Sequence, residues 1–380
     1  MPLKKQKFTI LKDDLTKAID IDDGLSLSVP VNMNFVEVGY LIKDTGFVPH
    51  GGVPQEKRHS LFTYTKKNGD SYFISAQGTT LQQYLEVDRE WVNIANSPTF
   101  TTDAEFGYVV YDDNLYLCNA VESYYRFDGT TFTEYASAPK GNILEIFEDR
   151  LFVAGVLAEP LTTYYSNVGV PTTFAGANVI KPTGTDHITG QVNFFGAMLI
   201  FKRDSIWKLS FVFDQVVSLF VPKLEIQNGQ YGACGRKAIS WVENDIWFFT
   251  GSEVRSIGYK DQQIGVLGVN TSVISETIKE ALSNINIDYY YKITTLYNNR
   301  RYYLCLPLGG TENDTTFVSH LLYGQAWTKY TGRAKARIGS STVNRGIIYT
   351  SNDSVSYGAI KWTVTAADAL PLNSQFITET

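Results

Sequence analysis

A short hairpin pattern that recurs along the chain restricts the fold more than any other feature of the sequence. Each copy has an apolar strand, a polar turn and an aromatic-rich strand. The copies are LFTYTKKNGDSYFIS (61–75), YVVYDDNLYLC (108–118), ILEIFEDRLFVAG (143–155), VNFFGAMLIFKRDSIWKLS (192–210), ISWVENDIWFFT (239–250), TTLYNNRRYYLCL (294–306) and TVNRGIIYTSND (342–353). Equivalent strand residues are separated by 44, 36, 48, 47, 56 and 45 residues: Tyr72, Tyr116, Phe152, Ile200, Trp247, Tyr303 and Ile348. A repeat of this length, built from short strands, is typical of a β-propeller.

The turns between these strands contain residues that tolerate a left-handed or tightly turned backbone. They are Asn68-Gly69, Asp112-Asp113-Asn114, Glu148-Asp149, Glu243-Asn244-Asp245 and Asn298-Asn299. The segment YRFDGTTFTEY (125–135) adds a strand, an Asp128-Gly129 turn and a returning strand. It resembles part of the Asp-box of sialidase propellers, but that motif has a residue between Asp and Gly. We therefore interpret this segment as a plain hairpin.

Aromatic residues are numerous enough to form the core of such a fold. The chain of 380 residues has 6 Trp, 24 Tyr and 22 Phe, and an isolated hairpin must bury its faces against neighbours to be stable. We predict an all-β protein, a β-propeller of about seven (six to eight) four-stranded blades. Residues 1–50 are expected to form an N-terminal arm that contributes one or more strands, and residues 51–380 a single propeller domain. One short helix is expected near 272–285, where Ile274, Ile278 and Leu282 have helical spacing.

Charge and cysteine content exclude several classes of protein. The formal net charge is −6, and Lys4, Lys5 and Lys7 are the only basic cluster, so a dedicated nucleic-acid binder is disfavoured. The three cysteines have no CxxC spacing, which predicts buried hydrophobic side chains. The N-terminus lacks an apolar signal segment, and the longest near-apolar run, FFGAMLIF (194–201), is too short to cross a bilayer. We expect a soluble protein made in the cytoplasm, without membrane insertion.

Two groups of carboxylates were weighed as pairs for glycoside hydrolysis, which needs two acids at a fixed separation. The first group is expected around a turn, where solvated charge is the default, and the second along one solvated face of a strand. These groups are Glu145, Glu148 and Asp149, and Glu86, Asp88 and Glu90. Neither is predicted to be catalytic.

Metal, nucleotide and sugar sites have equally weak support in the sequence. The histidines His50, His59, His187 and His320 are scattered, although His50 and His59 flank one loop. DIDDG (20–24) does not keep the calcium-ligand register, and no phosphate-binding glycine motif or GxSxG elbow occurs. Six tryptophans at 91, 207, 241, 247, 327 and 362 are interpreted mainly as core residues. We predict no catalytic, cofactor-binding or metal-binding residue, no cofactor and no enzymatic activity.

The middle of the chain resembles a family of tailed-phage virion propellers. ILEIFEDRLFVAGVLAEPLTTYYSNVGVPTTF (143–174) is similar to the family segment in which Arg-Leu-aromatic-Val-Ala-Gly precedes a Pro-containing loop, Tyr-Tyr-Ser and a Gly-x-Pro-x-x-aromatic turn. The matching residues are Arg150, Gly155, Pro160, Tyr164, Tyr165, Ser166, Gly169, Pro171 and Phe174. The next family unit is matched by ITGQVNFFGAMLIFKRDSIWKLS (188–210) at Gly196, Lys202, Ser205, Ile206 and Trp207. GQYGACGRKAISWVENDIWFFTGSEVRSIG (229–258) and YGQAWTKYTG (323–332) resemble later units.

The resemblance covers residues 140–380 well and the first 140 residues loosely. It implies a structural component of a tailed-bacteriophage virion, such as the tail hub or nozzle or a connector-associated tail protein. Such proteins form multimeric rings, of six-fold or related symmetry, around the DNA channel. The implied partners are other virion tail and connector proteins, with passing contact to DNA but no specific nucleic-acid site. The family often continues beyond the strand matching SQFITET, whereas this sequence stops at Thr380.

Two other functions share the predicted fold. One is a carbohydrate-binding or carbohydrate-cleaving propeller that acts at the host cell surface, which acids and tryptophans around a central channel would favour. The other is a protein-docking adaptor of the Kelch or WD type. The absence of regular Trp-Asp dipeptides and Gly-Gly pairs in each unit argues against the adaptor.

Overall fold

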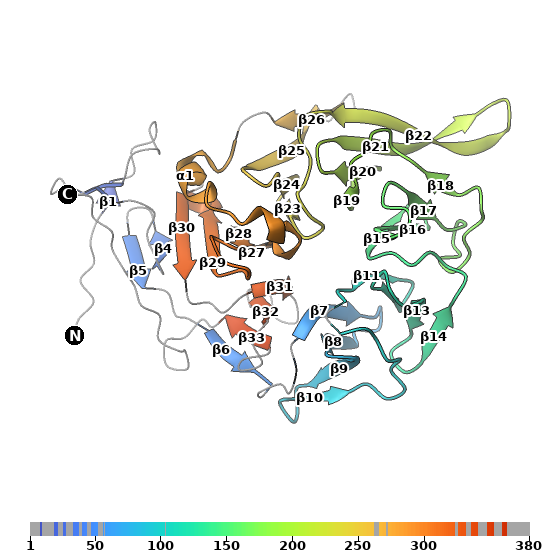
Figure 1. Ribbon diagram of the computed structural model, residues 1–380, viewed down its shortest axis with the longest axis horizontal. Coiled ribbons are helices and arrows are strands. Elements are labelled where there is room, and N and C mark those ends of the chain that lie inside the picture. Colours follow the sequence, from blue (N-terminus) through green and yellow to red (C-terminus); the bar gives the residue numbers. More distant parts are fainter. Residues whose placement is uncertain are drawn as a thin grey trace. The chain divides into compact units, whose positions relative to one another are not determined.

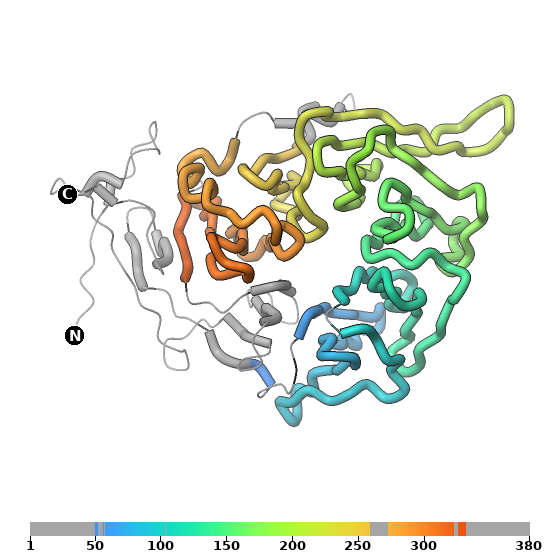
Figure 2. The backbone as a smooth tube through the Cα atoms, viewed as in Figure 1, coloured from blue at the N-terminus to red at the C-terminus, as the bar shows by residue number. Residues whose placement is uncertain are grey.

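The computed structural model describes the backbone and side chains of residues 58–102, 104–258, 273–322 and 326–331, together with residues 50, 51 and 56 (Figure 2). Outside these ranges it gives strands by their backbone alone. Contacts between Cα atoms divide the chain into two compact units. The middle unit contains residues 56–236 and 267–269, and the terminal unit contains residues 1–55, 237–266 and 270–380. The predicted division into an arm (1–50) and one propeller domain (51–380) stays a prediction.

The middle unit contains four antiparallel sheets, each built from four consecutive strands (Figure 1). The first two sheets are β7 (Arg58–Thr65), β8 (Ser71–Gln77), β9 (Thr80–Leu85) and β10 (Glu90–Asn93), then β11 (Gly107–Tyr111), β12 (Asn114–Cys118), β13 (Tyr124–Phe127) and β14 (Phe132–Tyr135). The next two are β15 (Ile143–Phe147), β16 (Arg150–Ala154), β17 (Thr163–Tyr165) and β18 (Val179–Ile180), then β19 (Ile188–Phe194), β20 (Ala197–Lys202), β21 (Ile206–Asp214) and β22 (Leu219–Asn228). β11 lies beside β7 and β15, and β15 lies beside β19. Side-by-side first strands are the arrangement of blades in a β-propeller.

Two further blades of consecutive strands follow, and all their residues except 267–269 belong to the terminal unit. They are β23 (Ile239–Val242), β24 (Asp245–Phe249), β25 (Val254–Asp261) and β26 (Val266–Asn270), then β27 (Thr294–Asn298), β28 (Arg301–Leu306), β29 (Thr315–His320) and β30 (Ala326–Thr331). Six blades of consecutive strands lie within the predicted range of six to eight but below its central value of seven. The all-β class and the four-stranded propeller blades are confirmed.

Strands from both ends of the chain form one more four-stranded sheet in the terminal unit, in the order β31-β32-β33-β6. Its strands are β31 (Ala336–Ser340), β32 (Ile348–Asn352), β33 (Ala359–Trp362) and β6 (Phe47–His50). Residues 47–50 pair antiparallel with residues 359–362. Smaller sheets are formed by β1 (Phe8–Thr9), β2 (Ile19–Ile21) and β3 (Ser26–Leu27), and by β4 (Met33–Glu37) and β5 (Tyr40–Lys43).

Helical structure in the described residues is limited to short segments. A 3₁₀ turn (Glu276–Ile278) continues into α1 (Lys279–Leu282), with Ile278 and Leu282 buried, which confirms the short helix expected near 272–285. Two more 3₁₀ segments span Ile287–Lys292 and Leu321–Tyr323. Among the described residues, no helix has the length and apolar character needed to cross a membrane.

The predicted turns form because their residues accept positive φ. Asp112 and Asp113, with φ of 45° and 58°, are the two residues between β11 and β12. Glu148 and Asp149, with φ of 45° and 54°, stand at the same place between β15 and β16. Two-residue turns with two positive φ angles match the right-handed twist of a hairpin. The hairpin expected at 125–135 is also present.

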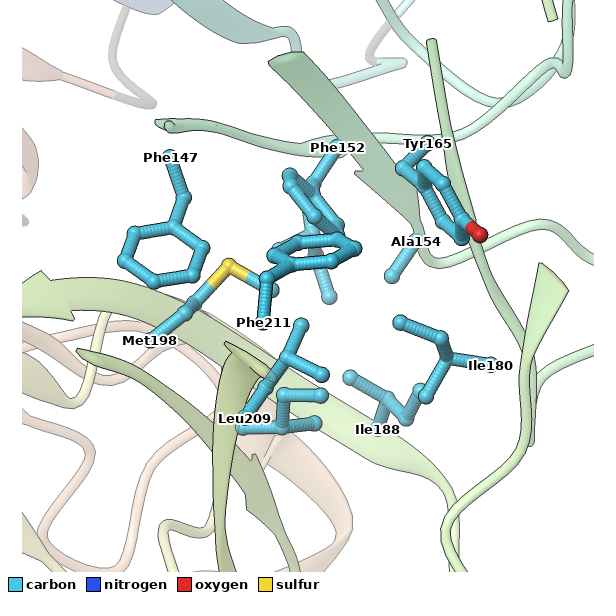
Figure 3. Close-up of a cluster of buried hydrophobic side chains, with 11 residues drawn as sticks. Phe147, Phe152, Ala154, Tyr165, Ile180, Ile188, Met198, Leu209 and Phe211 are labelled. Carbon is cyan, nitrogen blue, oxygen red and sulfur yellow. The ribbon is translucent and has the colours of Figure 1, made fainter. Parts of the chain in front are cut away.

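The core between two blades of the middle unit is largely aromatic. Phe147 and Phe152 from one blade pack against Met198, Leu209 and Phe211 from the next (Figure 3). The rings of Phe147 and Phe211 are 6.2 Å apart, centroid to centroid, and the rings of Phe152 and Phe211 are 6.5 Å apart. Because each hairpin is marginal alone, this packing stabilises both blades.

Candidate functional site

The acids Glu145, Glu148 and Asp149 are divided between a strand and a turn. Glu148 and Asp149 are exposed at the β15–β16 turn, where the Asp149 carbonyl accepts a hydrogen bond from the Gly169 N–H at 2.7 Å. Glu145 lies on β15, partly buried, and its Oε1 accepts from the Ile146 N–H at 3.1 Å. Burial raises the pKa of Glu145 to about 7. Glu148 and Asp149 are solvated turn residues, as expected, whereas Glu145 has a pKa near neutral pH because it is partly buried.

The second acidic group was predicted to alternate along a strand, and that prediction is wrong. Glu86 and Asp88 lie in the turn between β9 and β10, and Glu90 begins β10. Arg89 in this turn has φ of 56°, a conformation that reverses the chain direction. All three acids are exposed. Solvated charge therefore explains them.

Histidine and cysteine side chains are used inside the fold. His59 is buried, with Nε2 3.2 Å from the Gly78 carbonyl oxygen. His320 is buried with Nε2 2.9 Å from the Thr328 hydroxyl, and burial, with a smaller effect of Arg301, lowers its pKa to about 3. Residues 58–258 and 273–331, as far as they are described, contain no cluster of three metal-ligating side chains. DIDDG (20–24) lies outside the fully described residues.

The cysteines and most tryptophans behave as core residues. Cys118, Cys234 and Cys305 are free and buried, as predicted. Trp247 and Trp327 are buried, with exposed fractions of 4% and 5%. The remaining described tryptophans are Trp91 and Trp207, which are partly buried, and Trp241, which is 43% exposed. The side chain of Trp362 lies outside the described residues.

The family-like segment at 143–174 fixes the backbone of one blade. The Arg150 guanidinium lies 4.2 Å from the centre of the Phe211 ring. This ring belongs to the core shown in Figure 3. Gly155 has φ of 73°, and a Cβ there would lie 2.2 Å from the Asn142 Oδ1 atom. Only glycine fits at this position without displacing the neighbouring loop.

Three other matched residues stabilise the irregular half of the same blade. The buried Ser166 hydroxyl accepts from the Leu151 N–H at 2.9 Å and donates to a carbonyl at 3.0 Å. The Pro171 carbonyl accepts from the Tyr124 hydroxyl at 3.2 Å, and Phe174 meets the same tyrosine edge-on. These bonds satisfy groups that an irregular strand would otherwise leave unpaired.

Lys202, matched in the next unit, forms a buried ion pair. Its side chain has no exposed surface, and Nζ lies 2.8 Å from Asp186 Oδ1 and 2.9 Å from the Thr183 carbonyl oxygen. The Lys202 carbonyl in turn accepts from the Ala233 N–H at 3.0 Å. This residue therefore joins the loop before β19 to the loop after β22.

Arg236 connects two blades of the middle unit through their entry loops. Its Nη2 lies 3.2 Å from Glu105 Oε2, before β11, and its Nη1 donates to the Asn142 carbonyl, before β15. Both side chains of the ion pair are largely buried. Such a pair is costly to break and fixes the relative position of the two loops.

The surface feature that stands out is the β21–β22 hairpin, which extends beyond its own blade (Figure 1). Phe213 and Phe220, opposite each other in the ladder, are 55% and 62% exposed, with ring centroids 5.4 Å apart. The tip adds Val216 at 94% and Leu219 at 64% exposure. Large apolar patches on a soluble surface mark contacts with other molecules. We call residues 210–223 the apolar hairpin.

Reading the sequence alone missed the apolar hairpin. The recurring pattern ended at Ser210, so the following FVFDQVVSLFVP (211–222) was not assigned. The sequence signal that could have revealed it is a nearly continuous apolar run. In such a run the side chains on both faces of the strand are apolar, so the strand has no polar face. The Asp214 carboxylate preforms its turn by accepting from the Val216 N–H at 2.8 Å.

Comparisons with known proteins identify a fold but no family. No family model matches the sequence, and no curated protein matches it. The WD40 domain of Neurospora crassa Pan2 has a TM-score of 0.52 at 6% identity, over 87% of this chain and 99% of that chain. PorZ, a surface component of the type-IX secretion system of Porphyromonas gingivalis, has a TM-score of 0.50 at 10% identity, over 86% of this chain but only 39% of PorZ.

A computationally designed protein, Ika8, matches over 84% of this chain and 100% of its own length at 9% identity, with a TM-score of 0.48. At such identities a structural match identifies the fold alone. None of the three is described as a phage protein.

Proposed function

We propose that this chain is a structural component of a tailed-bacteriophage virion, a tail hub, nozzle or connector-associated protein. In this proposal several copies form a ring of six-fold or related symmetry around the DNA channel, in contact with other tail and connector proteins. The chain has no catalytic role and needs no cofactor. The ordered sequence resemblance between residues 140 and 380 supports the class of protein.

The observation that carries the proposal is the apolar hairpin. Phe213, Val216 and Phe220 project from a folded blade and are available to bind another protein. The family-like residues Ser166 and Lys202 support this interpretation, because their side chains stabilise loops of the blades. A subunit of a mechanical assembly requires both a rigid body and an adhesive surface.

The charge of the chain supports passage of DNA without specific binding. The net charge is −6, and Asp112, Glu148 and Asp149 add exposed carboxylates at blade turns. Carboxylates repel phosphates, so DNA that passes such a surface is not retained. In this proposal DNA contact is transient.

Mass spectrometry and electron cryomicroscopy of purified particles from the source of this sequence test the proposal. The expected result is the chain in the particle, in a multiple of three or six copies, at the tail. Its absence from particles, or a single copy, would contradict the proposal.

The second candidate is a propeller that binds or cleaves carbohydrate at the host cell surface. Trp241 on β23 favours it, because an indole face that is 43% exposed can stack on a sugar ring. Binding of the purified chain to host polysaccharide, lost in Trp241→Ala and kept in Trp247→Phe, would support this candidate.

A further inference from the structure

Beyond Leu209 the apolar hairpin is a two-stranded ribbon. β20 pairs with β21 from Ile206 to Leu209, whereas β21 continues to pair with β22 as far as Asp214. Among the strands that the structure describes, none pairs with β21 beyond Leu209 on that side. A two-stranded ribbon on its own is marginally stable in water. The ribbon therefore gains stability from any strand that adds to it.

Pro222 determines which backbone groups of the ribbon point outward. Opposite residues in an antiparallel pair exchange either two hydrogen bonds or none. Pro222 stands opposite Phe211 and has no N–H, so these two residues form a pair without hydrogen bonds. The N–H and C=O groups of Phe211 point away from β22, and those of Phe213, two residues further on, do the same.

The two edges of the ribbon therefore differ in their ability to accept another strand. The edge of β21 presents the outward groups of Phe211 and Phe213. The outer edge of β22 lacks a donor at Pro222, a common means of preventing strand addition. Only the β21 edge is suited to pairing.

We propose that the free protein forms a two-fold dimer in which β21 strands of two copies pair antiparallel along this edge. The result is a four-stranded sheet in the order β22-β21-β21-β22. The outward groups of Phe211 and Phe213 bond to the same groups of the second copy, and Phe213 and Phe220 of both copies share one face. A strand that pairs antiparallel with itself satisfies two-fold symmetry, which closes after two copies. This contact uses the same apolar hairpin that the proposed function offers to another protein, so it describes the free chain, and its test does not depend on the ring.

The exposed apolar area of the hairpin sets an upper limit on the apolar surface that such a dimer buries. The six most exposed apolar residues of the hairpin expose about 500–600 Å² in total, taking ~200 Å² for a whole phenylalanine. Their exposed fractions are 39% for Val212, 55% for Phe213, 94% for Val216, 53% for Val217, 64% for Leu219 and 62% for Phe220. Complete burial of these side chains on both copies would remove about 1,000–1,200 Å². Edge-to-edge pairing leaves both faces of the four-stranded sheet open, so the dimer buries less than this area and belongs with the weak interfaces that dissociate on dilution.

Charge favours a second copy over a membrane. Residues 206–228 carry Lys208, Lys223, Asp214 and Glu225, so the hairpin is neutral in a chain with net charge −6. Two copies meet there without like-charge repulsion, whereas an anionic bilayer repels the rest of the chain. Lipid also cannot satisfy the outward N–H and C=O groups at Phe211 and Phe213, which a second β21 strand does.

Sedimentation of the purified chain over a range of concentrations tests the dimer, with two variants that lose the same ring. Phe213→Ala keeps the outward N–H, whereas Phe213→Pro removes it and leaves every bond between β21 and β22 intact. The expected result is a wild-type dimer that dissociates on dilution, a dissociation constant raised at least tenfold in Phe213→Ala, and no dimer in Phe213→Pro. Val87→Glu, a change at a residue that is 94% exposed in another blade, should leave dimerisation unchanged.

Amide hydrogen exchange provides a second measurement that does not depend on the proline variant folding normally. The amides of Phe211 and Phe213 should exchange slowly at high concentration and rapidly after dilution, while those of Ser210 and Val212 change little. A monomer at all concentrations, equal effects of the alanine and proline substitutions, or binding to anionic vesicles that depends on Phe213 would overturn the proposal.

Discussion

In the ion pair between Lys202 and Asp186, removing the aspartate is expected to cost more unfolding free energy than removing the lysine. Lys202 is wholly buried, whereas the Asp186 side chain is 20% exposed. Asp186→Ala leaves the ammonium group buried with one remaining acceptor, the Thr183 carbonyl. Breaking a buried pair in this way costs about 3–5 kcal/mol of unfolding free energy. For a unit of this size that corresponds to a fall of roughly 6–20 °C in melting temperature.

The reciprocal change, Lys202→Met, is expected to cost less. Methionine replaces the aliphatic stem of lysine, and the carboxylate that remains can turn to water through its exposed part. A cost of about 1–2 kcal/mol is expected, since one partly hydrated acceptor loses its donor. The double variant should cost less than the sum of the two single variants.

Urea unfolding followed by tryptophan fluorescence measures these differences, because Trp207 donates a hydrogen bond to Ser205 close to the pair. Equal costs for the two single variants, or a larger cost for Lys202→Met, would refute the reasoning about which charge is buried.

The pH dependence of stability offers an independent check of this ion pair. Burial alone would raise the pKa of Asp186, but its hydrogen bond from Lys202 and others outweigh burial and lower that pKa. The contribution of Asp186 to stability is therefore present above the ordinary pKa of an aspartate, about 4. It is lost as the pH falls through the lower pKa of Asp186 in the folded protein.

Two further predictions concern residues of the blade β15–β18. Burial raises the pKa of Glu145 to about 7, so the folded protein holds a proton that the unfolded chain has lost above pH 4–5, and its stability falls as pH rises toward and through 7. Glu145→Gln should remove this fall and stabilise the protein at pH 8 by about 1–3 kcal/mol, whereas urea titrations that show the same slope with pH as wild type would contradict the burial. Gly155→Ala should destabilise by at least 1 kcal/mol more than Gly169→Ala. Both glycines have positive φ, but an added Cβ meets Asn142 only at Gly155, so equal melting temperatures for the two variants would rule out the steric explanation.

The sequence was sufficient for local structure wherever a residue type has one dominant use. Asp128 lies in the predicted turn and accepts hydrogen bonds from the Thr130 and Thr131 N–H groups at 2.8 Å each. Tyr116 and Phe152 fall on the second strand of their blades, as the repeat predicted. These features depend on neighbours in the chain, so a single sequence contains them.

Features that depend on contacts between residues far apart in the chain could not be predicted from the sequence alone. Glu86, Asp88 and Glu90 alternate as in a strand, but Arg89 adopts positive φ, a choice made by how β9 and β10 pack rather than by residue type. The partner of Lys202 lies sixteen residues away at Asp186, a distance at which sequence gives no pairing rule. The apolar hairpin also depends on tertiary pairing, because β21 loses its partner β20 beyond Leu209, which lies opposite Met198 at the start of β20.

Pairing of β6 with β33 has a consequence for biosynthesis. Residues 47–50 leave the ribosome early, yet their partner strand consists of residues 359–362. At ordinary elongation rates of about 5–20 residues per second, β6 waits roughly 15–60 s for that partner. Throughout this interval the edge of β6 that will pair with β33 can pair with other strands. Correct assembly of this sheet therefore depends on strands that are synthesised last.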